Sequence, residues 1–217
     1  MTLEAADRKS LSREQPVKSS RWPRTERRQA RIAAVLARRQ PDLTVVLENV
    51  HDPHNVSAIL RSCDAVGVLR VHVIYTVEEA PESAFARQTS ASAAKWVEVE
   101  RHDSVETCFD ALRANGLTIL ATALGEVAQP LFDVDLRRPV ALVFGNEMRG
   151  VSAEVLAHCD GLLEIPMAGM VQSLNVSVAA AVCLYEAFRQ RSAAGAYDSP
   201  RLSSDQRQAL QEDWLLR

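Results

Sequence analysis

The feature that most limits the possible folds is a regular alternation of apolar, β-branched runs with segments of helical period. Runs such as LTVVLE and VALVF are apolar on both faces, as in strands that helices cover on both sides. Strands are expected at 43–48, 70–75, 96–100, 117–124, 140–144 and 162–165, and helices at 56–66, 104–115, 152–158 and from 175 onward. The pattern predicts an α/β domain built on a mostly parallel sheet.

The two ends of the chain have a different character. Residues 1–20 are polar and aperiodic, which indicates a flexible extension. Residues 21–41 form a basic N-terminal arm, in which RTERRQARIAAVLARR (24–39) has a helical period that Pro41 ends. The main domain is expected to span 42–192, and a helical C-terminal tail 193–217, with its helix near 203–216.

Charge is divided unevenly along the chain. Residues 1–40 carry 11 basic and four acidic side chains, a net +7, whereas residues 41–217 carry 14 basic and 24 acidic ones, a net −10. A basic arm on an acidic body favours a polyanionic partner. A basic tail that is simply solvated remains the alternative.

Several classes of protein receive no support. No apolar run is long enough to span a bilayer, and the N-terminus lacks the apolar segment of a secretory signal. The four cysteines are far apart and form no CxxC pair, which is typical of reduced thiols in a cytoplasmic protein. His51 and His54 have no further ligands beside them, so no metal is expected. Neither a GxGxxG nor a GxxxxGK[ST] motif is present.

Three polar segments follow predicted strands. They are residues 48–55, continuing along a helix to Arg61, then 144–150, and then the stretch from 165 to 175 that opens an Ala-rich, apolar helix. Parallel α/β sheets bind ligands beyond the carboxyl ends of their strands. A loop that leads into the positive end of a buried helix can hold a polar ligand. The three segments therefore predict one shared site.

Each candidate residue also has a purely structural interpretation. Asn55, Ser173 and Asn175 are residue types that cap helix N-termini. An arginine such as Arg61 in the middle of a helix is most often a surface charge. His54 is interpreted as a polar contact at the mouth of the site.

The three segments, taken together, resemble the three motifs of the SpoU branch of the SPOUT RNA 2′-O-methyltransferases. The matching stretches are NVSAILR (55–61), VFGNEMRG (143–150) and IPMAGMVQSLNVSVA (165–179). The resemblance covers roughly residues 24–217. The basic arm, the phrase VHDPHN and the stretch FRQRSAAGAYDSPRL are similar to members that act on guanosine 18 in the D-loop of tRNA.

The resemblance implies a SPOUT fold with a deep C-terminal trefoil knot whose loops hold S-adenosylmethionine. It also implies a homodimer in which motif one and the arm of one subunit serve the cofactor of the other. The cofactor pocket would be formed, largely by main chain, at Thr122, Leu124, Gly145, Ile165, Met167 and Leu174.

The implied reaction is 2′-O-methylation of the guanosine 18 ribose of tRNA. The family assigns the central role to Arg61. Because a guanidinium with a pKa above about 12 is a poor base, we expect it to hold a phosphate and stabilise the forming 2′-alkoxide. Asn55 and Glu147 would orient Arg61, whereas Ser173 and Asn175 would position the methionine end of the cofactor.

Five arginines are expected to contact tRNA phosphates: Arg28, Arg31, Arg39, Arg189 and Arg191. Asp52 departs from relatives that often carry a basic residue there, which removes one expected phosphate contact. Two alternatives stay open. One is methylation of ribosomal RNA or of another tRNA position, and the other is a non-catalytic RNA-binding protein with the same fold.

Overall fold

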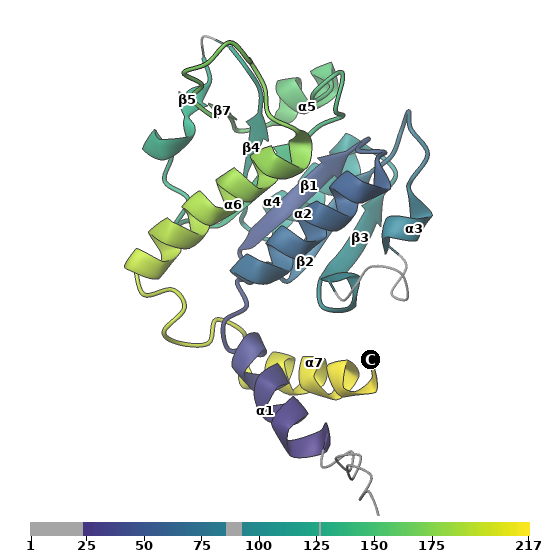
Figure 1. Ribbon diagram of the computed structural model, residues 1–217, viewed down its shortest axis with the longest axis vertical. Helices are drawn as coiled ribbons and strands as arrows, with labels where there is room; N and C mark the ends of the chain where they lie inside the picture. Colours follow the sequence, from purple (N-terminus) through teal and green to yellow (C-terminus); the bar gives the residue numbers. More distant parts are fainter. Residues whose placement is uncertain (1–23, 86–92, 126) are drawn as a thin grey trace, which may run out of the picture.

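The computed structural model describes residues 24–85, 93–125 and 127–217, so the predicted extension 1–20 lies outside the described residues. The strands described form one parallel sheet in the order β3-β2-β1-β6-β4-β7-β5 (Figure 1). They are β1 (Leu43–Glu48), β2 (Arg70–Ile74), β3 (Glu98–His102), β4 (Thr118–Thr122), β5 (Gln129–Pro130), β6 (Val140–Phe144) and β7 (Gly161–Glu164). The predicted α/β class is confirmed.

Helices cover both faces of the sheet, which explains why its central strands are apolar throughout. Helices α2 (Pro53–Val66) and α6 (Val176–Ala193) pack side by side across one face (Figure 1). Helices α4 (Val105–Ala114) and α5 (Ala153–His158) contribute to the core on the other face. Every residue of β1 and β6 is buried, as expected for strands between two helical layers.

Boundaries differ from the predicted ones where caps and short elements intervene. Helix α2 begins three residues earlier than predicted, because the Asp52 side chain accepts a hydrogen bond from the His54 N–H and Pro53 starts the helix. Asp52, not Asn55, is therefore the N-cap. Strand β3 lies two residues later than expected. Four short elements were not predicted: α3 (Glu82–Phe85), η1 (Ala93–Lys95), β5 and η2 (Leu131–Asp133).

The N-terminal arm and the C-terminal tail pack against each other away from the sheet (Figure 1). Helices α1 (Arg24–Leu36) and α7 (Ser204–Leu216) share a small core made by Ile32, Leu36 and Trp214. Helix α1 ends before the predicted 39, because the chain turns there and the Gln40 N–H donates to the Gly67 carbonyl. The arm and the tail are thus one structural unit.

Arg191 is buried near the amino ends of β1 and β6 and is no phosphate ligand in this fold. Its side chain has no solvent exposure. Its Nη1 donates to Asp42 at 2.7 Å, and its other nitrogens donate to the Leu136, Asp42 and Arg138 carbonyls. The predicted contact between Arg191 and RNA is therefore corrected to a structural clamp between the sheet and α6.

Arg39 is buried in the same way, and its predicted RNA contact is corrected too. Its guanidinium donates to the Asp64 carboxylate at 2.5 Å and to the Val68 and Trp96 carbonyls. It also lies 5.1 Å from the centre of the Trp214 ring. Burial lowers the pKa of Arg39, while the carboxylate of Asp64 raises it. Arg39 ties the end of the arm to α2 and α7.

No helix in the described ranges has the length and hydropathy needed to cross a membrane. The trefoil knot that the resemblance implies stays a prediction.

Candidate active site

A cleft of about 670 Å³ lies at the carboxyl ends of β4, β6 and β7. Its walls come from the segments 122–124, 144–151, 163–167 and 172–176. All six residues predicted to bind the cofactor line it: Thr122, Leu124, Gly145, Ile165, Met167 and Leu174. The fold therefore brings the second and third motifs to one cavity, as the pattern of strand ends predicted.

Gly145 is required by the way the loop after β6 folds back on itself. A Cβ atom at this position would lie 2.1–2.2 Å from backbone atoms of Gly150 and Val151, so any side chain is excluded. The turn is closed by the Gly150 N–H, which donates to the Asn146 carbonyl at 2.8 Å. Gly150 itself has a φ of 68°, which favours glycine. The backbone of this loop is thereby available to the cleft.

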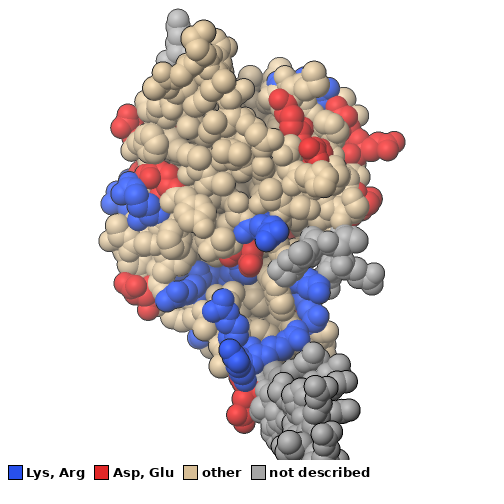
Figure 2. Space-filling model, viewed as in Figure 1, with Lys and Arg blue, Asp and Glu red and all other residues tan. Residues whose placement is uncertain are grey.

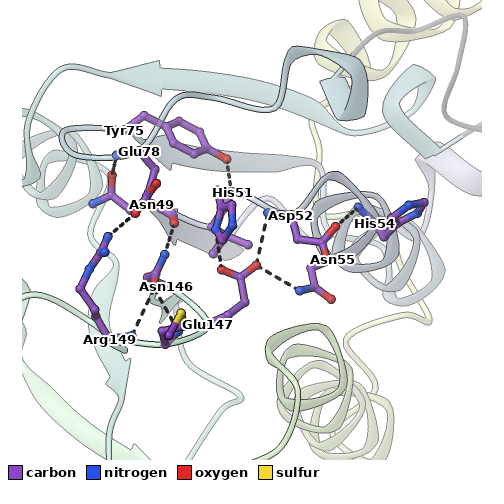
Figure 3. A network of polar contacts seen from close by, with 12 residues as sticks. Asn49, His51, Asp52, His54, Asn55, Tyr75, Glu78, Asn146, Glu147 and Arg149 are labelled. Atoms are coloured by element: carbon purple, nitrogen blue, oxygen red, sulfur yellow. Dashed lines mark hydrogen bonds and ion pairs between the residues drawn. The ribbon is translucent and has the colours of Figure 1, made fainter.

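A chain of side-chain hydrogen bonds joins the three motifs. The Nδ2 of Asn175 donates to Oδ1 of Asn55 at 3.0 Å, and the Nδ2 of Asn55 donates to Oε1 of Glu147 at 3.0 Å. Figure 3 shows Asn55 and Glu147 facing each other across this contact. Asn175 also caps α6, accepting a hydrogen bond from the Ser177 N–H. Both interpretations of Asn175, cap and site residue, thus fit the geometry.

Glu147 is held in its charged form by its surroundings. Burial alone would raise its pKa, but hydrogen bonds from Asn55 and from backbone N–H groups, together with the nearby His51, bring the pKa below its ordinary value. His51 Nδ1 lies 3.2 Å from Oε2, at ion-pair distance but without hydrogen-bond geometry. One oxygen of Glu147 therefore stays free of hydrogen bonds within the described residues.

Two asparagines that were not among the predicted site residues, Asn49 and Asn146, join the loops after β1, β2 and β6. Asn49 follows β1 with a φ of 53°, and its side-chain oxygen accepts from the N–H groups of residues 76–78 (Figure 3). Its carbonyl accepts from the side chain of Asn146 at 3.0 Å. Asparagine tolerates this backbone conformation better than most residues. An asparagine directly after a predicted strand was therefore the signal in the sequence that could have identified Asn49.

Comparison with known proteins agrees with this geometry. Residues 42–185 match the SpoU rRNA Methylase family, a span that includes the cleft and all three motifs. The chain belongs to this family.

Among curated relatives of this SpoU chain, the tRNA (guanosine(18)-2′-O)-methyltransferase of Thermus thermophilus is 54% identical over 192 residues, which cover 88% of this chain and 97% of the relative. The 23S rRNA (guanosine-2′-O-)-methyltransferase RlmB of Xanthomonas axonopodis is 44% identical over 149 residues, or 69% of this chain and 59% of the relative. Of these two relatives, the first is matched over nearly its whole length and the second over 59% of it.

Solved structures show the same arrangement. The TrmH/SpoU tRNA modifying enzyme of Aquifex aeolicus superimposes with a TM-score of 0.79 at 39% identity, covering 88% of this chain and 96% of that one. The SpoU methyltransferase AviRb of Streptomyces viridochromogenes, solved with AdoMet, has a TM-score of 0.62 at 28% identity over 72% of this chain and 62% of its own. The SpoU fold is therefore shown for this chain.

Two predicted site residues are not brought together with the rest. Arg61 is exposed on α2 and does not line the cleft. No hydrogen bond or ion pair to any described residue holds its guanidinium, so Asn55 and Glu147 do not contact it within one chain. His54 is also exposed, and its ring points away from the network in Figure 3. Ser173 is exposed and lines the cleft.

The remaining arginines predicted to contact RNA are at the surface. Arg28 and Arg31 are exposed on α1, and Figure 2 shows basic side chains gathered over this end of the molecule. Arg28 also donates to the Trp214 carbonyl at 3.3 Å, which links it to α7. Arg189 is exposed and pairs with Glu186 at 2.7 Å. These three side chains, unlike Arg39 and Arg191, are accessible to a large ligand.

Proposed function

We propose that this SpoU chain transfers a methyl group from S-adenosylmethionine to the 2′-hydroxyl of guanosine 18 in tRNA. The observation that carries the proposal is the cleft itself. It is lined by all six residues expected to bind the cofactor, and its rim carries the hydrogen-bonded chain from Asn175 through Asn55 to Glu147. The relation to the Thermus tRNA enzyme, over 97% of that enzyme, supports the choice of substrate.

The residues of the cleft fit a cofactor held mainly by backbone groups. Gly145 leaves no room for a side chain, and the hydroxyl of Thr122 already donates to the Val143 carbonyl at 3.0 Å. The loops therefore offer peptide N–H and C=O groups with apolar side chains around them, such as Ile165 and Leu174. When bound, the cofactor supplies an electrophilic methyl group. This chain supplies orientation and the exclusion of water.

Arg61 does not line the cleft of its own chain. It is exposed on α2, beside α6, whose exposed face carries the apolar side chains Val178 and Tyr185. We infer a homodimer that buries this face and brings Arg61 of one subunit to the cleft of the other. There the guanidinium would hold an RNA phosphate and stabilise the 2′-oxygen as its proton leaves.

The homodimer predicts that two differently inactivated subunits complement each other. Arg61→Ala keeps its cleft, and Gly145→Val, in which the side chain would clash with Gly150, keeps its Arg61. A dimer of one of each has one complete site. Random mixing of equal amounts should therefore restore about a quarter of the wild-type rate. If each chain built its own site, the mixture would be as inactive as its components.

The RNA would lie across the arm. Arg28 and Arg31 on α1, with Arg189 on α6, are the exposed cations available for phosphates, which give affinity without reading bases. A tRNA substrate would also place the enzyme in the cytoplasm.

The test is methylation of a tRNA transcript with methyl-labelled cofactor, followed by mapping of the labelled nucleotide. The matched control is the same transcript with 2′-deoxyguanosine at position 18, which lacks only the acceptor oxygen. Label in the first and none in the second is the expected result. Equal label in both would contradict the choice of nucleotide, although not the reaction class.

The second candidate substrate is ribosomal RNA. It is favoured by the 44% identity to the Xanthomonas 23S rRNA enzyme, although the chain spans only 59% of that relative. Fragments of 23S rRNA in the same assay decide between the two. Cofactor binding without transfer to either RNA would instead identify a non-catalytic RNA-binding protein.

A further inference from the structure

Two histidines and a cysteine meet on the face of the sheet that α4 covers. His72 lies in the middle of β2, and His102 is the last residue of β3. Cys108 lies on the face of α4 that packs against the sheet. One ligand atom from each lies within 4.8 Å of the other two. The closest pair is His72 Nδ1 and His102 Nε2, at 2.9 Å. Residues this far apart in the sequence have no spacing that would reveal the cluster.

The cluster lies at the margin of the apolar layer between the sheet and α4, next to the paired side chains of Arg70 and Glu100. His72 is 7% exposed, the His102 side chain is 8% exposed, and Cys108 is fully buried beside Val105 and Phe109. Burying two imidazoles is costly unless their polar atoms find partners. His72 Nδ1 and His102 Nε2 are hydrogen-bonded to each other, so a bound metal ion would have to replace this hydrogen bond.

The chemistry of the three groups narrows the ligand to one class. Imidazole nitrogen and thiolate sulfur are the preferred donors of zinc and similar divalent transition metals, whereas Mg²⁺ and Ca²⁺ prefer oxygen. Glu100 adds a carboxylate on the same face, because it is in register with His72 on the neighbouring strand. Its Oε1 lies 3.7 Å from His102 Nε2. Its other oxygen, Oε2, already pairs with Arg70 Nη1 at 2.9 Å, so only Oε1 faces the cluster.

We propose that His72, His102 and Cys108 bind a divalent transition-metal ion of the zinc class, distinct from the methyl-transfer site. Neither β2 nor β3 contributes to the cleft. The proposal therefore does not depend on the proposed function.

Metal binding requires all three side chains to adjust. Tetrahedral Zn²⁺ with bonds of about 2.0–2.3 Å separates two donor atoms by roughly 3.3–3.6 Å. The two histidine nitrogens must move apart by about half an ångström, and the sulfur must approach them. On binding, the imidazole that donates the hydrogen bond between His72 and His102 moves its proton to its other ring nitrogen, and the Cys108 thiol gives its proton to solvent. Nitrogen–metal and sulfur–metal bonds then form with no change of oxidation state.

The ion would act as a structural crosslink. Strand β3 is at the edge of the sheet and pairs only with β2 among the described strands. A metal held by β2, β3 and α4 would join this edge strand to the layer above it. Metal removal should therefore lower thermal stability while leaving the cofactor cleft in place.

The test begins with the full chain, stripped by chelator and then titrated with Zn²⁺ or Co²⁺. About one equivalent of Zn²⁺ per chain should be retained after desalting. Co²⁺ should produce visible bands of a four-coordinate site and a near-ultraviolet thiolate-to-cobalt charge-transfer band. Zn²⁺ should raise the midpoint of thermal unfolding and chelator should reverse it.

Variants assign the ligands. Cys108→Ala should abolish the charge-transfer band and weaken Zn²⁺ binding by at least about 100-fold, since a ligand matters more than the groups behind it. Cys159→Ser, a half-buried cysteine on the same side of the sheet, is the matched control and should keep the band. His51→Ala removes a surface histidine and should also leave binding unchanged. Circular dichroism checks that each variant is folded.

The proposal is overturned if the stripped wild-type chain retains no metal, or if the cobalt spectrum lacks a thiolate band. It is also overturned if the band survives in Cys108→Ala or disappears in Cys159→Ser. Because these readouts involve the metal and the fold alone, they are independent of any result on RNA methylation.

Discussion

The two ends of the sheet use polar side chains in opposite ways. At the carboxyl ends of β4, β6 and β7, Asn175, Asn55 and Glu147 form a chain at the rim of a cleft. Near the amino ends of β1 and β6, Arg191 is buried and saturated by Asp42 and three carbonyls. One end keeps polar groups available to a ligand, and the other uses them entirely for the fold.

The comparison shows that residue type does not decide the role of an arginine. Arg61 and Arg31 are exposed, whereas Arg39 and Arg191 have no exposed surface. A guanidinium has five donors in a fixed fork, which suits a phosphate as well as a set of carbonyls at chain turns. Only the fold determines whether a given guanidinium is exposed to a phosphate or buried among carbonyl groups.

The largest effect is expected at the buried end. Arg191→Ala removes the buried one of the two arginines that pair with Asp42, which keeps Arg201, and it leaves the Leu136 and Arg138 carbonyls without this donor. Breaking a buried pair costs about 3–5 kcal/mol. Urea denaturation should show this loss in the free energy of unfolding. Arg189→Ala, on the same helix, removes an exposed guanidinium and should lower the free energy of unfolding much less, because Glu186 keeps its hydrogen bond from Gln190. Equal losses would mean that the clamp is no more important than a surface ion pair.

The next largest effect is expected at Arg61. If it stabilises charge only during methyl transfer, Arg61→Ala should lower kcat by about 10²–10³-fold, as loss of one such donor does. Its free energy of unfolding and its binding of S-adenosylmethionine should stay close to wild type, because Arg61 is exposed and outside the cleft. Single-turnover kinetics, calorimetry and urea denaturation measure the three quantities.

Arg61→Lys separates two roles of the same side chain. Lysine keeps the charge but loses the fork that binds two oxygens at once. We expect it to recover only a small part of the lost rate. Near-full turnover in Arg61→Lys would show that charge alone is sufficient and that the two-oxygen geometry is wrong.

A smaller effect is expected on the arm. Arg28→Ala and Arg31→Ala should each weaken tRNA binding and reduce the slope of log affinity against log salt by about 1. Binding of S-adenosylmethionine should be unchanged, because α1 is remote from the cleft lining. Filter binding across a salt series measures the slope. A loss of cofactor affinity equal to the loss of tRNA affinity would contradict a role limited to phosphates.

Much of the fold could be predicted because its signal is local. The strands 43–48 and 140–144 were predicted to the residue, since apolar runs between two helical layers have no alternative placement. Short elements such as β5 were not predicted, because two residues carry no period. The N-cap of α2 was assigned to Asn55 instead of Asp52, because both residue types cap and only the Pro53 beside Asp52 distinguishes them.

The residues that line the cleft could be predicted from the sequence, but the long-range contacts of the arginines could not. Strand ends and motif residues indicated where a cleft would form, and all six predicted lining residues are there. The burial of Arg39 and Arg191 was not predictable, because it depends on carbonyls from distant turns, such as Val68 and Arg138. The cluster of His72, His102 and Cys108 was not predictable either, since it depends on the pairing of β2 with β3 and on the packing of α4 against them.

The smallest effect concerns the pH dependence that Glu147 gives to the carboxyl end. Its folded pKa is held below the ordinary value. A carboxylate of this kind stabilises the fold above its unfolded pKa, about 4.3, and that contribution is lost as pH falls through the folded value.

Glu147→Gln keeps the acceptor for Asn55 but cannot ionise. The difference in unfolding free energy between wild type and Glu147→Gln should therefore shrink below about pH 4.3, as followed by urea denaturation from pH 7 to pH 3. A difference between wild type and Glu147→Gln that stays constant over this range would mean that the Asn55 hydrogen bond matters at the rim and the charge does not.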